Sequence, residues 1–111
     1  MKKPLPVRCC TIDITPDQED RLVTMSHAMG NPLRFEVLKY LLVHPGCITG
    51  DIVDVLPISQ STTSVHLKVL KDAGWICGTV EGTATSYCLD QENLKWYQNT
   101  IALAFGNEQG V

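Results

Sequence analysis

The sequence predicts one small, mostly helical α+β domain with about five helices and a two-stranded β-hairpin. Helix-capping residues recur along the chain, each just before an apolar pattern of helical period. After Gly74 the apolar period changes from that of a helix to that of a strand. The chain has 111 residues, 44% hydrophobic and 19% charged, which suits one modest core and excludes a disordered chain.

The first two helices are each predicted by an N-terminal cap followed by proline. Thr15-Pro16-Asp17-Gln18 matches a capping box, and the helix that it opens ends near Gly30. Asn31-Pro32 opens the second helix, and His44-Pro45-Gly46 ends it. On the second helix, the residues expected to face the core are Phe35, Leu38, Leu41 and Leu42.

Two more helices follow at short range. A short third helix, capped by Thr49 or Asp51, ends before Pro57, and Ser59 caps a fourth helix that ends at Gly74. Two helices joined by such a turn form a helix-turn-helix, whose second helix is placed to enter a major groove of DNA. The residues of the fourth helix expected to face inward are Leu67, Leu70 and Ala73.

The last part of the domain combines the hairpin with a final helix. Residues 75–80 and 84–89 favour strands, and the turn between them makes the fold a winged helix-turn-helix. Asp90 caps a last helix. The expected division of the chain is a basic arm with a Cys pair at residues 1–14, the winged domain at residues 15–105 and a disordered tail at residues 106–111.

The outward face of the fourth helix carries the candidate DNA-binding residues. Gln, Ser and Thr side chains can hydrogen-bond base edges or phosphates, and Lys can neutralise phosphate charge. The backbone amides at the start of the helix can also hold a phosphate oxygen. The candidates are Ser59, Gln60, Ser61, Thr62, Ser64, Val65, His66, Lys68 and Lys71.

The net charge argues mildly against a nucleic-acid binder, and its distribution weakens that argument. Nine Lys and Arg against 12 Asp and Glu give a formal charge of −3. Residues 1–12 hold three basic residues and no acid, and residues 55–71 contain no carboxylate. An acid-free, hydroxyl-rich window in an acidic protein is either a docking place for a polyanion or a solvated helix face.

Residues 59–76 resemble the recognition-helix signature of the ArsR/SmtB winged-helix repressors. Their pattern is roughly Ser-Gln-x-x-Val-Ser-x-His-Leu-Lys-x-Leu-x-x-Ala-Gly-Leu-Val, and residues 25–34 resemble the entry to their second helix. The resemblance covers residues 15–105. It implies a homodimer with the first and last helices packed across a two-fold axis, bound to palindromic double-stranded operator DNA and released by an inducer.

The chain departs from the family pattern at several positions. Thr63 stands where the family usually has Val, and Val65 where it often has Arg or Gln, so we expect one DNA contact to be missing. The wing turn at residues 80–85 has an acid and no Lys or Arg, which predicts weak anchoring of the wing. His66 matches the family's motif His, and we expect it to support the helix or contact phosphate rather than bind metal.

Five cysteines suggest an inducer that reacts with thiols. No apolar run approaches the roughly 18–20 residues of a membrane span. The first residues lack the apolar stretch of a signal peptide, so we expect a cytoplasmic protein with reduced thiols.

Adjacent Cys9 and Cys10 with Cys47 supply three soft ligands for As(III) or Sb(III). The alternative is that Cys9 and Cys10 lie in a disordered arm and Cys47 fills an apolar gap.

The resemblance supports this metalloid site in part. The family's best-known arsenic site is a Cys-x-Cys pair at the start of the third helix, where this chain has Cys47 and Thr49. Some relatives instead combine an N-terminal Cys-Cys with one cysteine near this helix. The last helix has no histidine, which disfavours the family's zinc site there.

Cys77 and Cys88 form a separate group. With a two-residue turn at Gly82-Thr83 they face each other across the hairpin, as a redox pair, an extra metal site or simply two small strand residues.

The other functional alternatives are a thiol-redox or sulfide sensor, and a winged-helix interaction module without metal sensing. An enzyme is not expected, and neither is an organic cofactor, because no catalytic triad, carboxylate pair or Gly-rich phosphate motif is present.

Overall fold

The computed structural model describes residues 12–56 and 58–106, and within these ranges it has five helices and a three-stranded sheet. This confirms the mostly helical winged helix-turn-helix. Most of the predicted arm and tail lies outside the described residues. The elements are α2 (Pro16–Met29), α3 (Pro32–Val43), β1 (Cys47–Ile48), α4 (Thr49–Val55), α5 (Gln60–Ala73), β2 (Ile76–Glu81), β3 (Ala84–Leu89) and α6 (Gln91–Phe105).

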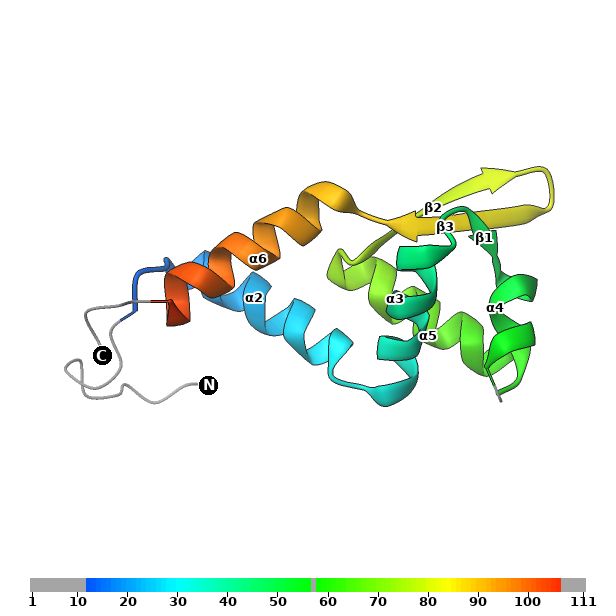
Figure 1. Ribbon diagram of the computed structural model, residues 1–111, viewed down its shortest axis with the longest axis horizontal. Helices are drawn as coiled ribbons and strands as arrows, with labels where there is room; N and C mark the ends of the chain where they lie inside the picture. Colours follow the sequence, from blue (N-terminus) through cyan, green and yellow to red (C-terminus); the bar gives the residue numbers. More distant parts are fainter. Residues whose placement is uncertain (1–11, 57, 107–111) are drawn as a thin grey trace.

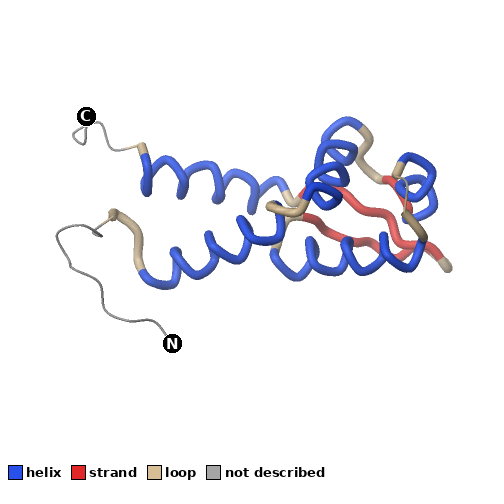
Figure 2. The backbone as a smooth tube through the Cα atoms, turned by 90° about the horizontal axis from the view of Figure 1, so that it is seen from below, coloured by secondary structure: helices blue, strands red, loops and turns tan. Residues whose placement is uncertain are grey.

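The helices and the sheet are divided between two ends of the molecule. α2 and α6 extend together toward one end, whereas α3, α4, α5 and the sheet gather at the other (Figures 1 and 2). A hydrogen bond of 2.7 Å between the Ser26 and Tyr97 hydroxyls joins α2 to α6. None of the helices in the described part of the chain is long and apolar enough to cross a membrane.

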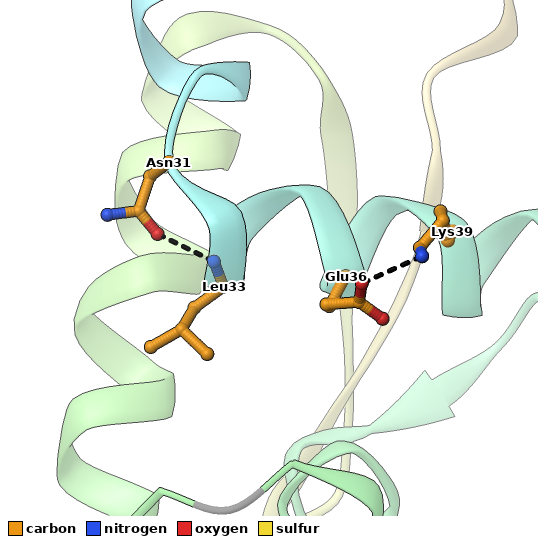
Figure 3. A network of polar contacts seen from close by, with 4 residues as sticks. All are labelled: Asn31, Leu33, Glu36 and Lys39. Carbon is orange, nitrogen blue, oxygen red and sulfur yellow. Dashed lines mark hydrogen bonds and ion pairs between the residues drawn. The ribbon is translucent and has the colours of Figure 1, made fainter.

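The predicted caps set most of the helix boundaries. The side chains of Thr15 and Gln18 accept each other's backbone N–H at 3.1 and 2.9 Å, which completes the capping box of α2. The Asn31 side chain accepts the backbone N–H of Leu33 at 2.9 Å at the start of α3 (Figure 3). Ser59 and Asp90 cap α5 and α6 as predicted.

The predicted cap of α4 is wrong. The helix already includes Thr49 and Asp51, so neither residue precedes it. β1 runs directly into α4, and its pairing with β3 places the chain where the helix begins. β1 itself was not predicted, because a two-residue strand is too short to show a period.

The sheet is antiparallel in the order β1-β3-β2. Glu81 pairs with Ala84 around Gly82-Thr83, and Gly82 has a φ of 64°, as a tight hairpin turn requires. The register that follows pairs Cys77 with Cys88, as predicted.

The core lies where α2, α3 and α5 meet the sheet. The Trp75 indole N–H donates to the backbone oxygen of Met25 at 2.7 Å in this core. The prediction that α3 buries Phe35 and Leu42 is wrong: they are 45% and 62% exposed, because the face of α3 toward β3 and α5 carries Val37 instead. The core residues are Met25, Ala28, Val37, Leu38, Leu41, Ile52, Leu67, Leu70, Trp75, Ile76 and Leu89.

Candidate nucleic-acid interface

The predicted DNA-binding residues lie on the solvent-facing side of α5. All of them are exposed except His66, which is half-buried. The opposite side of the helix is held by Leu67 and Leu70, which are buried in the core. Ala73, predicted to face inward with them, is half-buried, and Thr63 is fully buried in its place. The structure therefore fixes one side of α5 and leaves a polar and basic side free.

The start of α5 is held by a network of hydroxyl groups. Ser59 Oγ accepts the backbone N–H of Thr62 at 3.2 Å and lies 3.1 Å from Ser61 Oγ. The Thr63 hydroxyl donates to the backbone oxygen of Ser59 at 2.9 Å. Ser59 therefore caps the helix and orients its first amides, and the adjacent Gln60 side chain is exposed.

The basic residues of α5 lie toward its C-terminal half. Lys68 Nζ is 2.9 Å from Asp72 Oδ2, and the two side chains are 75% and 63% exposed. Such an exposed ion pair is weak, so a DNA phosphate can replace Asp72 as the partner of Lys68. Lys71, in the last turn, is also exposed.

His66 links α5 to the N-terminal end of α3. Arg34 Nη1 lies 3.4 Å from His66 Nδ1, and Arg34 Nε donates to the backbone oxygen of Ala28 at 2.6 Å. Burial, and then the Arg34 charge, lower the pKa of His66. Because guanidinium can only donate, Nδ1 accepts and the His66 proton lies on Nε2. This arrangement agrees with His66 supporting the helix.

Arg34 lies in this region but was not among the residues predicted from the sequence. Its only signal was its place at the end of the segment 25–34 that resembles the family's second-helix entry. Arg34 and His66 are 32 positions apart in the sequence, so their contact could not be predicted from spacing.

The C-terminal end of α5 is joined to the beginning of α6. The Asn93 side chain donates to the backbone oxygen of Gly74 at 2.9 Å, and Arg21 Nη2 of α2 donates to Asn93 Oδ1 at 2.5 Å. Asp90 Oδ1 accepts the backbone N–H of Asn93 at 3.0 Å. Direct hydrogen bonds therefore join α2 and α6 to the end of α5.

The structure does not test the predicted metalloid site. Cys9 and Cys10 lie outside the described residues, and Cys47 lies in β1 opposite Tyr87 of β3. Within residues 12–56 and 58–106, no three His, Cys, Asp or Glu side chains are grouped to hold a metal ion. The three-cysteine site stays a prediction.

Comparisons with known proteins identify the family. Residues 31–76 match the profile described as "Bacterial regulatory protein, arsR family". The chain is 30% identical over 79 residues to an uncharacterized HTH-type transcriptional regulator, MJ1325, of Methanocaldococcus jannaschii, covering 71% of this chain and 89% of that protein. It is 31% identical over 88 residues to the HTH-type transcriptional repressor SmtB of Mycobacterium tuberculosis, covering 78% of this chain and 64% of that protein.

Another similar protein is the arsenical resistance operon repressor of Bacillus subtilis, 30% identical over 67 residues, with 60% of this chain and 64% of that protein covered. The chain thus spans slightly less than two thirds of the length of SmtB and of this repressor.

A solved structure has the same fold. The homodimeric winged helix-turn-helix DNA-binding domain of a possible ArsR-family regulator from Mycobacterium bovis superposes with a TM-score of 0.67 at 20% identity, covering 83% of this chain and 86% of that one. The family resemblance is thereby confirmed, as is the expectation of a regulator rather than an enzyme. The chain belongs to the ArsR family of bacterial regulatory proteins, which are DNA-binding winged helix-turn-helix transcriptional regulators.

Proposed function

We propose that this protein is a dimeric repressor that binds operator DNA through α5 and is released by a soft thiophilic inducer, As(III) or Sb(III). The observation that carries the DNA-binding part is the division of α5 into a buried side and an exposed polar side. Gln60 and Ser64 lie one helical turn apart on the exposed side, and Lys68 lies one turn further. That row supplies base-reading groups near the N-terminus of the helix and a phosphate-binding cation beyond them.

Exposed apolar residues on α2 and α6 support the dimer. Val23 of α2 is 58% exposed, and Leu103 and Phe105 of α6 are 50% and 77% exposed. Large apolar side chains are favoured in contacts that exclude water, and α2 and α6 are the helices that the family resemblance assigns to the dimer. The homodimeric neighbour from Mycobacterium bovis is consistent with this assembly.

The position of Cys47 supports the inducer part. Cys47 begins β1, which runs directly into α4, and α4 packs against α5. A metalloid bound by Cys47 together with Cys9 and Cys10 would therefore act one helix away from the DNA-binding surface. As(III) favours three thiolate ligands, and one similar protein is an arsenical resistance operon repressor.

Selection of a DNA site tests the proposed DNA binding. Reduced protein is mixed with a pool of random duplexes, the bound fraction is amplified over several rounds, and the affinity for the enriched duplex is measured by fluorescence anisotropy. We expect a palindromic sequence to be enriched, with two half-sites about one helical turn apart, because the recognition helices of a dimer occupy successive major grooves. Failure to enrich any sequence would support the alternative of an interaction module.

Release of the enriched duplex by As(III) tests the proposed inducer. We expect As(III) to release the wild-type protein under reducing conditions, and Cys9→Ser and Cys47→Ser to abolish release while DNA binding persists. Cys77→Ser is the matched control and should respond as the wild type does, since Cys77 lies on β2. If Cys9→Ser and Cys47→Ser still respond, the cysteine assignment is wrong. If As(III) releases neither the wild-type protein nor any variant, As(III) is not the inducer.

A further inference from the structure

Cys77 and Cys88 form a pair of thiols at the base of the β-hairpin. They are directly opposite each other in the register of β2 and β3, so both side chains leave the same face of the sheet. Their neighbours Ile76 and Leu89 are buried in the core, which puts the two cysteines on the other face. Cys77 is exposed and Cys88 is half-buried, so solutes have access to the pair.

The spacing of an antiparallel pair suits a disulfide bond. Directly opposed residues have Cα atoms about 4.5–5.5 Å apart, and disulfides join Cα atoms about 4.4–6.8 Å apart. The backbone register therefore already holds the two cysteines within the range that a disulfide needs, without a change of pairing.

A hydrogen bond connects this pair to the beginning of α6. Cys77 Sγ donates to Asp90 Oδ2 at 3.4 Å, while the other carboxylate oxygen of Asp90 caps α6 through the backbone N–H of Asn93. Burial and this carboxylate raise the pKa of Cys77, so the reduced protein retains the S–H group at neutral pH.

We propose that Cys77 and Cys88 form a reversible intramolecular disulfide by exchange with a low-molecular-weight disulfide, RSSR, and that this removes the hydrogen bond between Cys77 and Asp90. One cysteine attacks RSSR, giving a mixed disulfide and one RSH, and the second cysteine then displaces the other RSH. The two cysteines are oxidised, RSSR is reduced, and the two thiol protons leave on the two RSH molecules. This site is separate from the proposed metalloid site.

The disulfide has a defined route to the recognition helix. Asp90 loses its sulfur partner but continues to cap α6, and Asn93, held by that cap, bonds the backbone oxygen of Gly74 at the end of α5. Oxidation therefore changes the surroundings of Asp90 and Asn93 first, and those of Gly74 through its hydrogen bond with Asn93.

A variant that retains only this thiol pair tests the inference without using DNA or As(III). The full chain with Cys9→Ser, Cys10→Ser and Cys47→Ser is incubated with oxidised glutathione, and thiol titration and peptide mapping are combined with amide NMR spectra. We expect both thiols to be lost as one Cys77–Cys88 disulfide within a single chain, and we expect dithiothreitol to reverse it. We also expect shifts of the Asn93 and Gly74 amide signals.

The control is Cys88→Ser in the same background, which should give only a glutathione adduct on Cys77. Wild-type protein, mapped in the same way, should contain the same Cys77–Cys88 peptide. This result would show that the disulfide does not arise from a folding defect of the variant. Persistent glutathione adducts on both cysteines, cross-links between chains or unreacted thiols would overturn the inference.

Discussion

The cation and the anion of the Lys68–Asp72 ion pair can be removed separately by substitution. Lys68→Gln deletes a cation from the exposed side of α5, and Asp72→Asn deletes the anion that holds it at 2.9 Å. If Lys68 contacts a phosphate, the first change weakens DNA binding, and the second strengthens it because Lys68 no longer has a competing carboxylate beside it.

The salt dependence of DNA binding gives the size of the first effect. Each phosphate contact contributes about 0.9 to the slope of log K against log salt concentration, so Lys68→Gln should reduce that slope by about 0.9. The lost ion pair is exposed and spans one helical turn, so it contributes only about 0.3–0.5 kcal/mol to the free energy of unfolding. The two variants should therefore remain folded, and their effects on DNA affinity should have opposite signs.

Fluorescence anisotropy on the enriched duplex at several salt concentrations measures the slope. Lys39→Gln is the matched control, because Lys39 forms a similarly exposed ion pair with Glu36 at 2.7 Å but lies on α3 (Figure 3). It should leave the slope unchanged. A contact between Lys68 and a DNA phosphate is refuted if Lys68→Gln keeps the wild-type slope, or if Lys39→Gln lowers the slope equally.

Three further predictions concern stability and are checked by urea unfolding. Gly74→Ala should destabilise more than Gly46→Ala: φ is 98° and 83°, a conformation that costs a side chain about 1–2 kcal/mol, but only the Cβ at Gly74 meets a side chain, at 3.2 Å. Equal losses would contradict this. His66→Gln should reduce the loss of stability between about pH 7.5 and about pH 5.5, because burial lowers the pKa of His66 in the fold and the unfolded state binds more protons there. An unchanged pH dependence would exclude His66 as its source. Trp75→Phe should cost about 1–3 kcal/mol, since its indole N–H bonds the Met25 oxygen in the core. A smaller loss would mean that this bond adds little.

The caps of α2, α3, α5 and α6, the hairpin register and the exposed side of α5 were predictable because each depends on residues close together in the sequence. Thr15 with Gln18 and Ser59 with Thr62 are pairs three positions apart. The pairing of Cys77 with Cys88 follows once the turn is placed at Gly82.

The features that the sequence did not reveal depend on tertiary packing. β1 exists only because β3 offers it a free edge. α3 carries apolar residues around much of its surface, so their order alone does not say that Val37 is buried while Phe35 is exposed.

The links around the recognition helix were missed for a similar reason. The bonds from Arg34 to His66 and from Arg21 to Asn93 join residues 32 and 72 positions apart. No local pattern brings such residues together.

The proposed reading of DNA sequence by α5 is tested most directly by the affinity of Gln60→Ala for two duplexes. Gln60 is exposed in the first turn of α5, where a recognition helix contacts base edges. We predict that Gln60→Ala lowers affinity for the enriched duplex by about 1–3 kcal/mol and leaves affinity for a scrambled duplex unchanged. Gln98→Ala on α6 should change neither affinity. Equal affinity of the wild-type protein for the two duplexes, or an equal loss on both in Gln60→Ala, would contradict the claim.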